Sequence, residues 1–155
     1  MKALKTLLLL MLLLLVPLCA IAGGVQKVGV KDLRGFIDSS KGRVLVINYW
    51  ATWCQPCVKE FPGLVNLRRT YPESELNLIG ISVDYDVRPV ENFLKKQEVN
   101  FTIVIDDGSI ASMLAVQSIP RTIIYNRKGE KVLDHIGFIS EESYLHVVER
   151  LLTAP

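Results

Sequence analysis

The chain has 155 residues, of which 50% are hydrophobic and 22% charged, and its formal net charge is +2. This composition excludes a disordered or low-complexity chain, because it contains enough apolar residues to form a core. The charges nearly balance and form no basic patch or tail, so we expect no nucleic-acid partner.

Residues 1–22 are typical of a secretory signal peptide. Two lysines precede an apolar run at residues 7–18, and small residues favour cleavage after Ala22. An uncleaved N-terminal anchor is the alternative, because the apolar stretch approaches the ~20 residues that span a bilayer. Lipidation of Cys19 ranks below cleavage, since Leu18 is not the small residue that usually precedes a lipidated cysteine. We therefore expect an exported, periplasmic or extracytoplasmic protein whose residues 23–155 form a single domain.

Apolar periodicity predicts alternating strands and helices after the leader. In chain order they are a strand at 25–30, a helix at 32–37, a strand at 44–49, a helix at 58–69, a strand at 76–83, a helix at 88–98, a strand at 101–105 and a helix at 109–116. Strands at 121–125 and 130–136 then form a hairpin closed at Gly129. Ser140 caps a last helix with Leu145, Val148 and Leu152 on its buried face. This order indicates an α/β fold with three layers and one mixed sheet.

Two cysteines, Cys54 and Cys57, lie where the strand at 44–49 gives way to a helix. The first N–H groups of a helix lack partners, and the aligned peptide dipoles leave partial positive charge there. A thiolate at this position is stabilised, so its pKa falls from about 8.5 toward neutrality. Pro56 suits the first turn because its missing N–H costs nothing there. The pair therefore predicts thiol–disulfide chemistry.

Two other interpretations of the cysteine pair compete with redox chemistry. A zinc site needs further ligands, and His135, His146 and Cys19 are not spaced as a ligand pair, so we expect no metal. A purely structural disulfide is weakly supported, because closing so short a loop removes little entropy from the unfolded chain.

Residues 49–57 read Tyr-Trp-Ala-Thr-Trp-Cys-Gln-Pro-Cys, and Lys-Glu-Phe-Pro follows at 59–62. This run resembles the active site of the thioredoxin superfamily. Together with Asn48, Glu60 and the leader, it makes residues 30–153 similar to the exported TlpA/ResA-like thiol–disulfide oxidoreductases. The resemblance implies a thioredoxin-like three-layer sandwich, with a central mixed sheet flanked by helices and no cofactor. The extra helix and strand before Pro120 resemble the TlpA-type insertion.

The resemblance also implies roles at the site. Cys54 is the expected nucleophile and the more exposed sulfur, and Cys57 is the expected resolving thiol. Asn48 replaces the buried Asp of ordinary thioredoxins and cannot take a proton. Glu60, one turn after Cys57, matches the active-site Glu of the group, and we expect it to act as acid/base for Cys57 or to raise the cysteine pKa values. A solvated glutamate on the helix surface is the alternative.

Pro120 occupies the place of the superfamily's cis-proline, which would present the Ile119 backbone to a substrate peptide as an added strand. Trp50 is expected in the core, and Trp53 at the rim of the substrate surface. Arg121 either adds positive charge near Cys54 or lies on a solvated edge.

We expect an enzyme, a protein-disulfide reductase, that acts as a monomer on disulfide-bearing client proteins. By resemblance, apocytochrome c is a candidate client and a membrane thiol–disulfide protein the electron donor, which would place the enzyme in cytochrome c maturation. A net oxidant or isomerase is the first alternative, although Gln55-Pro56 resembles the reducing members more. A copper-binding chaperone is the alternative from a different class, although such proteins usually space their cysteines three apart and add a nearby His.

Overall fold

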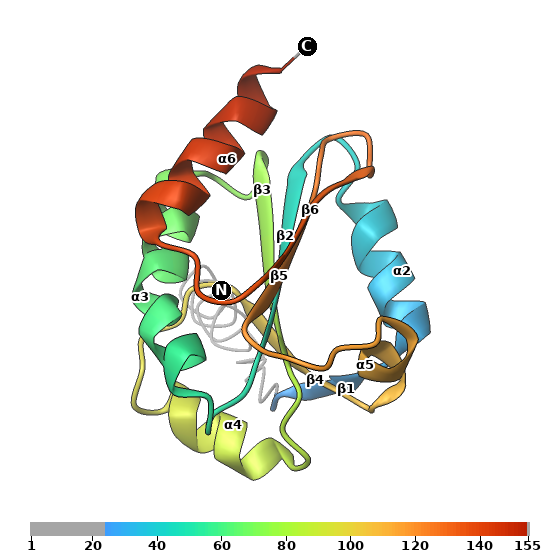
Figure 1. Ribbon diagram of the computed structural model, residues 1–155, viewed down its shortest axis with the longest axis vertical. Helices are drawn as coiled ribbons and strands as arrows, with labels where there is room; N and C mark the ends of the chain where they lie inside the picture. The colour runs from blue at the N-terminus through green and yellow to red at the C-terminus, as the bar shows by residue number, and fades with distance from the viewer. Residues whose placement is uncertain (1–23, 155) are drawn as a thin grey trace, which may run out of the picture.

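A mixed sheet of six strands lies at the centre of the computed structural model, which describes residues 24–154 (Figure 1). The strands are β1 (Gln26–Val28), β2 (Val44–Trp50), β3 (Leu76–Ser82), β4 (Thr102–Asp106), β5 (Arg121–Tyr125) and β6 (Lys131–Ile136). Their order across the sheet is β1-β4-β3-β2-β5-β6. The first four strands in this order are parallel. Strand β5 pairs antiparallel with β2, and β6 pairs antiparallel with β5.

Helices cover both faces of this sheet (Figure 1). Helices α2 (Val30–Ser39) and α5 (Ser109–Met113) lie on one face. Helices α3 (Gln55–Thr70) and α6 (Glu141–Thr153) lie on the other, and α4 (Val87–Leu94) packs near the start of α3. The predicted three-layer α/β arrangement is therefore confirmed.

Strand β2 is the centre of the core, and all seven of its residues are buried. Successive side chains of a strand point to opposite faces. Accordingly Leu45, Ile47 and Tyr49 pack with the cluster under α2 and α5, whereas Val44 and Val46 pack under α3 and α6. This double burial explains why the strand is almost continuously apolar in sequence.

The predicted elements are present with shifted ends. Helix α3 begins at Gln55, three residues earlier than predicted, because Cys54 serves as its N-cap and Pro56 fits within its first turn. Helix α4 ends at Leu94 rather than at Glu98, and its last N–H groups turn back to the Glu91 and Phe93 carbonyls. The hairpin turn is as predicted, with Gly129 at φ +83°.

The buried face of α6 differs from the prediction. Ser140 caps this helix as expected, by accepting the Ser143 N–H at 3.2 Å. Tyr144 and Val148 are the fully buried residues, whereas Leu145 and Leu152 are only half-buried. A tyrosine thus takes the innermost place on the helix, and its hydroxyl enters the site described below.

The segment between β3 and Pro120 supplies the predicted extra elements. It forms α4, β4 and α5, and β4 enters the sheet between β3 and β1. Within residues 24–154, no helix is long and apolar enough to cross a membrane. The expected leader, with Cys19 and the cleavage site after Ala22, lies outside the described residues.

Candidate active site

The two cysteines of the motif form a disulfide at the N-terminus of α3. Cys54 has an extended backbone at the N-cap position, and its sulfur accepts the Cys57 N–H at 3.3 Å. Cys54 is 6% exposed and Cys57 is fully buried. Cys54 is therefore the more exposed residue of the pair, which is the direction that we predicted.

The loop before Cys54 is anchored to the end of β3 by Asp84. This buried carboxylate accepts the Thr52 N–H at 2.9 Å, the Thr52 hydroxyl at 2.8 Å and the Ser82 hydroxyl at 2.7 Å. Because charge-assisted bonds of this kind are the strong ones, they fix the loop that presents the disulfide.

The two tryptophans of the motif have opposite environments. Trp50 is fully buried, with its ring 4.5 Å from Phe61 and 5.0 Å from Phe93, as expected for a core residue. Trp53 is 65% exposed beside the disulfide. A hollow of about 440 Å³ opens next to Trp53, between the segments that follow β3 and β4, and the exposed Tyr85 also lines it. Exposed aromatic side chains around a hollow are typical of an interaction surface.

Glu60 is buried, not solvated, with only 2% of its surface exposed. Its Oε1 accepts the Ile139 N–H at 2.7 Å and the Tyr144 hydroxyl at 3.1 Å, and its Oε2 accepts the Asn48 amide at 3.0 Å. The helix-surface alternative is therefore wrong. The reason is that α6 crosses α3 closely here: a Cβ at Gly63 would lie only 3.2 Å from that of Glu141.

Burial and hydrogen bonding act on the ionisation of Glu60 in opposite directions. Removal from water raises the pKa of this carboxyl above its ordinary value, and this is the largest effect. The bonds from Ile139, Asn48 and Tyr144 favour the charged form and offset part of the rise in pKa. A buried carboxyl with a raised pKa, one helical turn from a cysteine, is a better proton acceptor than an ordinary carboxylate.

The peptide bond between Ile119 and Pro120 is cis, as predicted. Ile119 packs against the apolar cluster that contains both cysteines. Arg121 does not lie on a solvated edge, because its side chain is only 13% exposed and its guanidinium is paired with Asp134 at 2.8 Å and also donates to the Leu114 carbonyl. Its charge is thus neutralised on the sheet.

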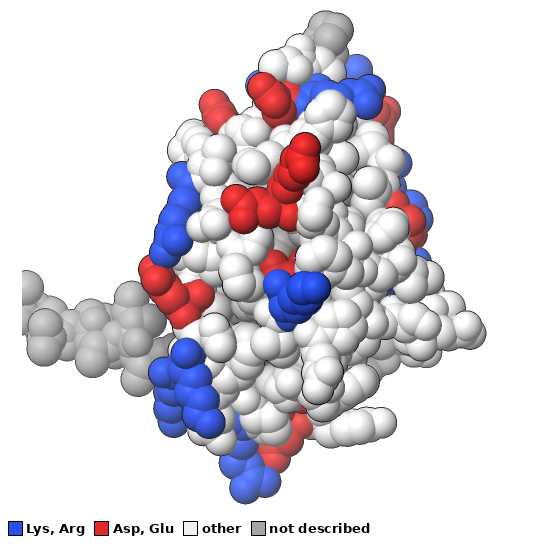
Figure 2. All heavy atoms as spheres, turned by 60° about the vertical axis from the view of Figure 1, so that its left-hand side comes forward, with Lys and Arg blue, Asp and Glu red and all other residues white. Residues whose placement is uncertain are grey.

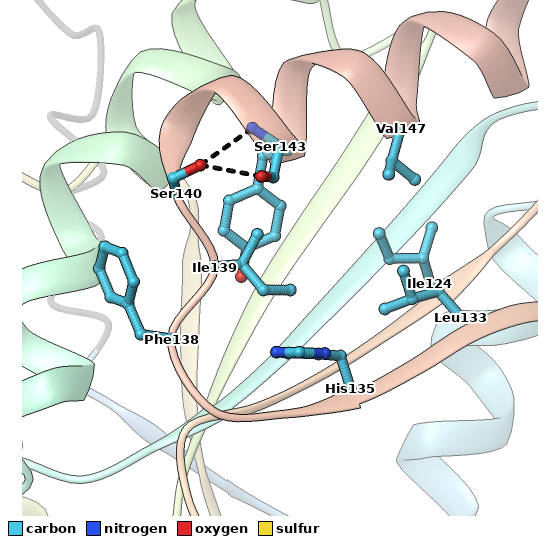
Figure 3. A pocket seen from close by; sticks show the side chains of 9 residues that line it. Ile124, Leu133, His135, Phe138, Ile139, Ser140, Ser143 and Val147 are labelled. Atoms are coloured by element: carbon cyan, nitrogen blue, oxygen red, sulfur yellow. Dashed lines mark hydrogen bonds between the residues drawn. The ribbon is translucent and has the colours of Figure 1, made fainter.

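Beyond Glu60, a second pocket of about 370 Å³ lies between β5, β6 and α6 (Figure 3). Its walls are mostly apolar, and the Ser140 and Ser143 side chains at its edge bond to each other. Two of its lining residues, Ile139 and Tyr144, are also the ones that hold Glu60. His135 lines this pocket and is exposed, as is His146 on α6.

Charged residues elsewhere are scattered. On the face that carries α3 and α6, Figure 2 shows basic and acidic side chains spread in small groups over a mostly uncharged surface. Within residues 24–154, no three His, Cys, Asp or Glu side chains lie together as a metal site would need.

Three residues around Glu60 were not predicted from the sequence: Ile139 and Tyr144, which donate to Glu60, and Thr122, which bonds to Asn48 and to Tyr144. Tyr144 carried a weak signal, since a tyrosine on the apolar face of a helix needs a partner for its hydroxyl. Thr122 sits opposite Asn48 in the register of β2 and β5. To predict that contact from the sequence, one would have to know that β2 and β5 are neighbours in the sheet.

Comparison with known proteins gives a consistent result. The model of the AhpC/TSA family matches residues 22–132. The thiol–disulfide oxidoreductase ResA of Bacillus subtilis is 32% identical over 111 residues, which cover 71% of this chain and 62% of that protein. ResA of Bacillus cereus is 31% identical over 118 residues, covering 76% and 64% of the two chains. The chain thus spans less than two thirds of the length of these relatives.

Solved structures show the same fold. A thiol:disulfide interchange protein DsbE of Chlorobium tepidum superposes with a TM-score of 0.69 at 24% identity, covering 75% of this chain and 84% of that one. StoA of Bacillus subtilis superposes with a TM-score of 0.61 at 27% identity, covering 70% and 82%. The predicted thioredoxin-like fold is therefore confirmed.

Proposed function

Because the chain belongs to the AhpC/TSA family, we propose that it is a thiol–disulfide oxidoreductase that reduces disulfide bonds in client proteins. One observation carries the proposal: a Cys54–Cys57 disulfide at a helix N-terminus, with the buried carboxyl of Glu60 one turn further along the same helix. The printed name of the ResA relatives supports the same reaction class.

The proposed reaction begins with the reduced pair. The Cys54 thiolate attacks one sulfur of the client disulfide, so a mixed disulfide forms and the other client sulfur leaves as a thiolate. Cys57 then gives its proton to the Glu60 carboxylate, and its thiolate attacks the Cys54 sulfur. The second client sulfur leaves as a thiolate. Glu60 then releases the proton that it took from Cys57, and this proton together with one from water converts the two client thiolates to thiols. Two electrons pass to the client, and the protein ends with the Cys54–Cys57 disulfide.

The reducing direction follows from the charge at Glu60. A strong oxidant of this class is one whose reduced thiolate form is stabilised. A carboxylate beside the cysteines disfavours the thiolate and raises the thiol pKa values. Glu60 therefore opposes the oxidant alternative. The copper-chaperone alternative predicts tight Cu(I) binding that survives the Glu60→Gln change, whereas a reductase does not require copper.

The client is proposed to lie over the exposed side of Cys54. Trp53 would contact it at the rim, and the backbone of Ile119 would pair with it as an added strand. We further propose that residues 1–22 direct export, with cleavage after Ala22, and that a membrane thiol–disulfide protein re-reduces the pair. Apocytochrome c is the proposed client, and the enzyme is proposed to act as a monomer.

Single-cysteine variants test the reaction. With insulin as the disulfide substrate, Cys54→Ser is expected to abolish reduction, because no exposed nucleophile remains. Cys57→Ser is expected to accumulate a mixed disulfide with the substrate, detectable by intact mass, because the resolving thiol is absent. Equal loss without a trapped intermediate in Cys57→Ser would contradict these roles. Equilibration of the same wild-type protein with glutathione separates reductase from oxidant, since a potential near that of DsbA, about −120 mV, would refute the reducing direction.

A further inference from the structure

Four buried side chains from four different elements meet around Glu60. They are Asn48 on β2, Glu60 on α3, Thr122 on β5 and Tyr144 on α6, and none is more than 2% exposed. The Asn48 amide donates to Glu60 at 3.0 Å and to Thr122 at 3.1 Å. The hydroxyls of Thr122 and Tyr144 lie 2.7 Å apart, and Tyr144 lies 3.1 Å from Glu60. The four side chains thus form a closed ring of hydrogen bonds.

The direction of every bond in the ring follows from the charge of Glu60. An ionised carboxylate only accepts, so the single hydroxyl hydrogen of Tyr144 points to Glu60. In the 2.7 Å contact between the Thr122 and Tyr144 hydroxyls, the hydrogen must then come from Thr122, so Thr122 donates to Tyr144. Thr122 in turn accepts the second N–H of Asn48. Each hydrogen is used once, and no two donors face each other.

A protonated Glu60 fits this ring less well. Ile139 and Asn48 can only donate to it, so its added hydrogen could bond only to the Tyr144 oxygen. The Tyr144 hydrogen would then turn to Thr122, whose own hydrogen would lose its acceptor. A nearby buried acceptor without a hydrogen-bond partner is Asn48 Oδ1, the oxygen of the amide whose nitrogen donates to Glu60. The surroundings therefore favour the ionised carboxylate, against the cost of burying its charge.

We propose that Tyr144 and Thr122 are positioning residues that keep Glu60 ionised and oriented to accept the proton of Cys57. Tyr144 acts directly by donating to Glu60, and Thr122 acts through Tyr144, because donating to a hydroxyl makes that hydroxyl a better donor. The inference rests on the proposed function and assigns two residues to its resolving step.

The groups that face Glu60 make Tyr144 the main lever. From α6 the titratable neighbour is Tyr144, which bonds to Glu60, and on α3 itself Cys57 precedes Glu60 by one turn. Asn48 on β2 bonds to Glu60 and Thr122 on β5 bonds to Asn48, and neither of these two titrates. The charged residues nearby, Lys59, Glu141 and Glu142, are exposed, and the exposed His135 borders the pocket on β6. The pKa of Tyr144 is itself raised well above its ordinary value, by burial and then by the charge of Glu60, so it remains a donor throughout the working range.

The test compares four variants of the full domain. Tyr144→Phe removes the hydroxyl and keeps the ring, and Thr122→Val removes the other hydroxyl at equal size. Thr122→Ser keeps the hydroxyl and should restore wild-type behaviour. Tyr71→Phe is the matched control, because its hydroxyl also bonds to α6, at the Leu145 carbonyl, but does not touch Glu60.

Two measurements are made on each variant. The first is the titration of the Glu60 side-chain carboxyl carbon by NMR, assigned with Glu60→Gln. The second is the pH profile of resolution, measured as release of a model thiol from a preformed mixed disulfide on Cys54. In Tyr144→Phe the ionised form loses one donor, so the NMR midpoint should move to higher pH, and resolution on the acidic side should slow about tenfold. Thr122→Val should shift the NMR midpoint and slow resolution in the same direction, but by a smaller amount.

A merely structural role would change thermal stability and leave both pH midpoints in place, and that result in a folded Tyr144→Phe overturns the proposal. If Tyr144→Phe does not fold, the pair Thr122→Val and Thr122→Ser decides in the same way. Failure of the wild type to reduce disulfides would refute the proposed function, whereas the NMR titration would still decide whether the ring controls Glu60.

Discussion

Asn48 brings two hydrogen-bond donors and no charge to the space between β2 and α3. Its two N–H groups hold Glu60 and Thr122, so the amide links the central strands to the helix that carries the disulfide. By resemblance, ordinary thioredoxins have a buried Asp at this position. Here the buried carboxyl lies instead on the helix of Cys57 itself, one turn away, which leaves the strand position free to act as a donor.

Asn48→Asp tests this division of roles. The new carboxylate would lie about where the amide now donates, roughly 3 Å from the oxygen of Glu60, and two carboxylates that close cannot both ionise at low cost. Thr122 would also lose its donor. We expect the variant to lose about 2–4 kcal/mol of unfolding free energy at pH 7, and less at pH 5, where one carboxyl is protonated.

Urea denaturation at both pH values measures the effect of Asn48→Asp. Asn77→Asp on the neighbouring strand β3 is the matched control, because the Asn77 amide donates to the Ser40 hydroxyl and not to a carboxylate. An equal loss in both variants, independent of pH, would show that carboxylate repulsion is not the cause.

At the scale of elements, the hairpin of β5 and β6 is held by a charge cluster. Asp134 on β6 accepts from Arg121 and Lys131 at 2.8 and 2.9 Å, and its side chain is 26% exposed. The bond from Arg121 contributes most to lowering the pKa of Asp134 to about 2. A depressed carboxyl pKa stabilises the fold above the pKa of the unfolded chain, and this stabilisation disappears as pH falls through the folded value.

Asp134→Asn is therefore expected to cost about 0.5–1 kcal/mol at pH 7, discounted for its partial exposure. The cost should fade between about pH 4 and pH 2, as the wild-type carboxyl is protonated. Denaturation curves across this range provide the measurement. Asp38→Asn removes the more exposed pair with Lys41 and should change stability by less than about 0.5 kcal/mol. A cost at Asp134 that persists unchanged at pH 2 would indicate lost packing instead.

The elements themselves were largely predictable from the sequence. Strand β2 is buried on both faces, and such strands are continuously apolar. The turn at Gly129 and the cap at Ser140 carry local chemical signals that need no knowledge of the fold. The start of α3 was placed too late, because the apolar pattern begins after the cap at Cys54 and the proline that follows it.

Burial of Glu60 could not be predicted, because its causes are distant in the chain. The cysteine motif and Pro120 are recognised from local sequence. Glu60 is instead shielded from water by α6 and by the loop that contains Ile139. The two residues that bond to it there, Ile139 and Tyr144, lie 79 and 84 residues further along the chain. From α3 alone, a glutamate two residues before Pro62 looks like a surface residue. Its partners become visible only when the three layers are assembled.

At the scale of the whole molecule, α3 and α6 cover one face of the sheet (Figure 1). Glu60 on α3 is buried there and is bonded by Tyr144 on α6. Folding therefore transfers this carboxyl from water to the interior, and the largest effect is to raise its pKa. The titration of Glu60 is consequently linked to the stability of the entire domain.

The sign of this linkage is definite. Between the pKa of Glu60 in the unfolded chain and its raised value in the native protein, the native state binds more protons than the unfolded state. Stability contributed by Glu60 is therefore greatest at low pH, falls as pH rises through this window, and levels off above the native pKa. Glutamine does not titrate, so Glu60→Gln has no such slope.

Glu60→Gln should accordingly gain stability relative to the wild type as pH rises from about 4 to 8, when the oxidised proteins are compared by urea denaturation. Its offset at acidic pH depends on how the ring rearranges, because a glutamine N–H must be accepted either by the Tyr144 hydroxyl oxygen or by Asn48 Oδ1 after the amide turns. Glu142→Gln removes a carboxylate from an exposed position of α6 and controls for the change in net charge. If the difference between Glu60→Gln and wild type stays constant over this pH range, burial does not raise the pKa of Glu60. Glu60 would then be a weak base at all working pH values, and it would hold the proton of Cys57 only poorly.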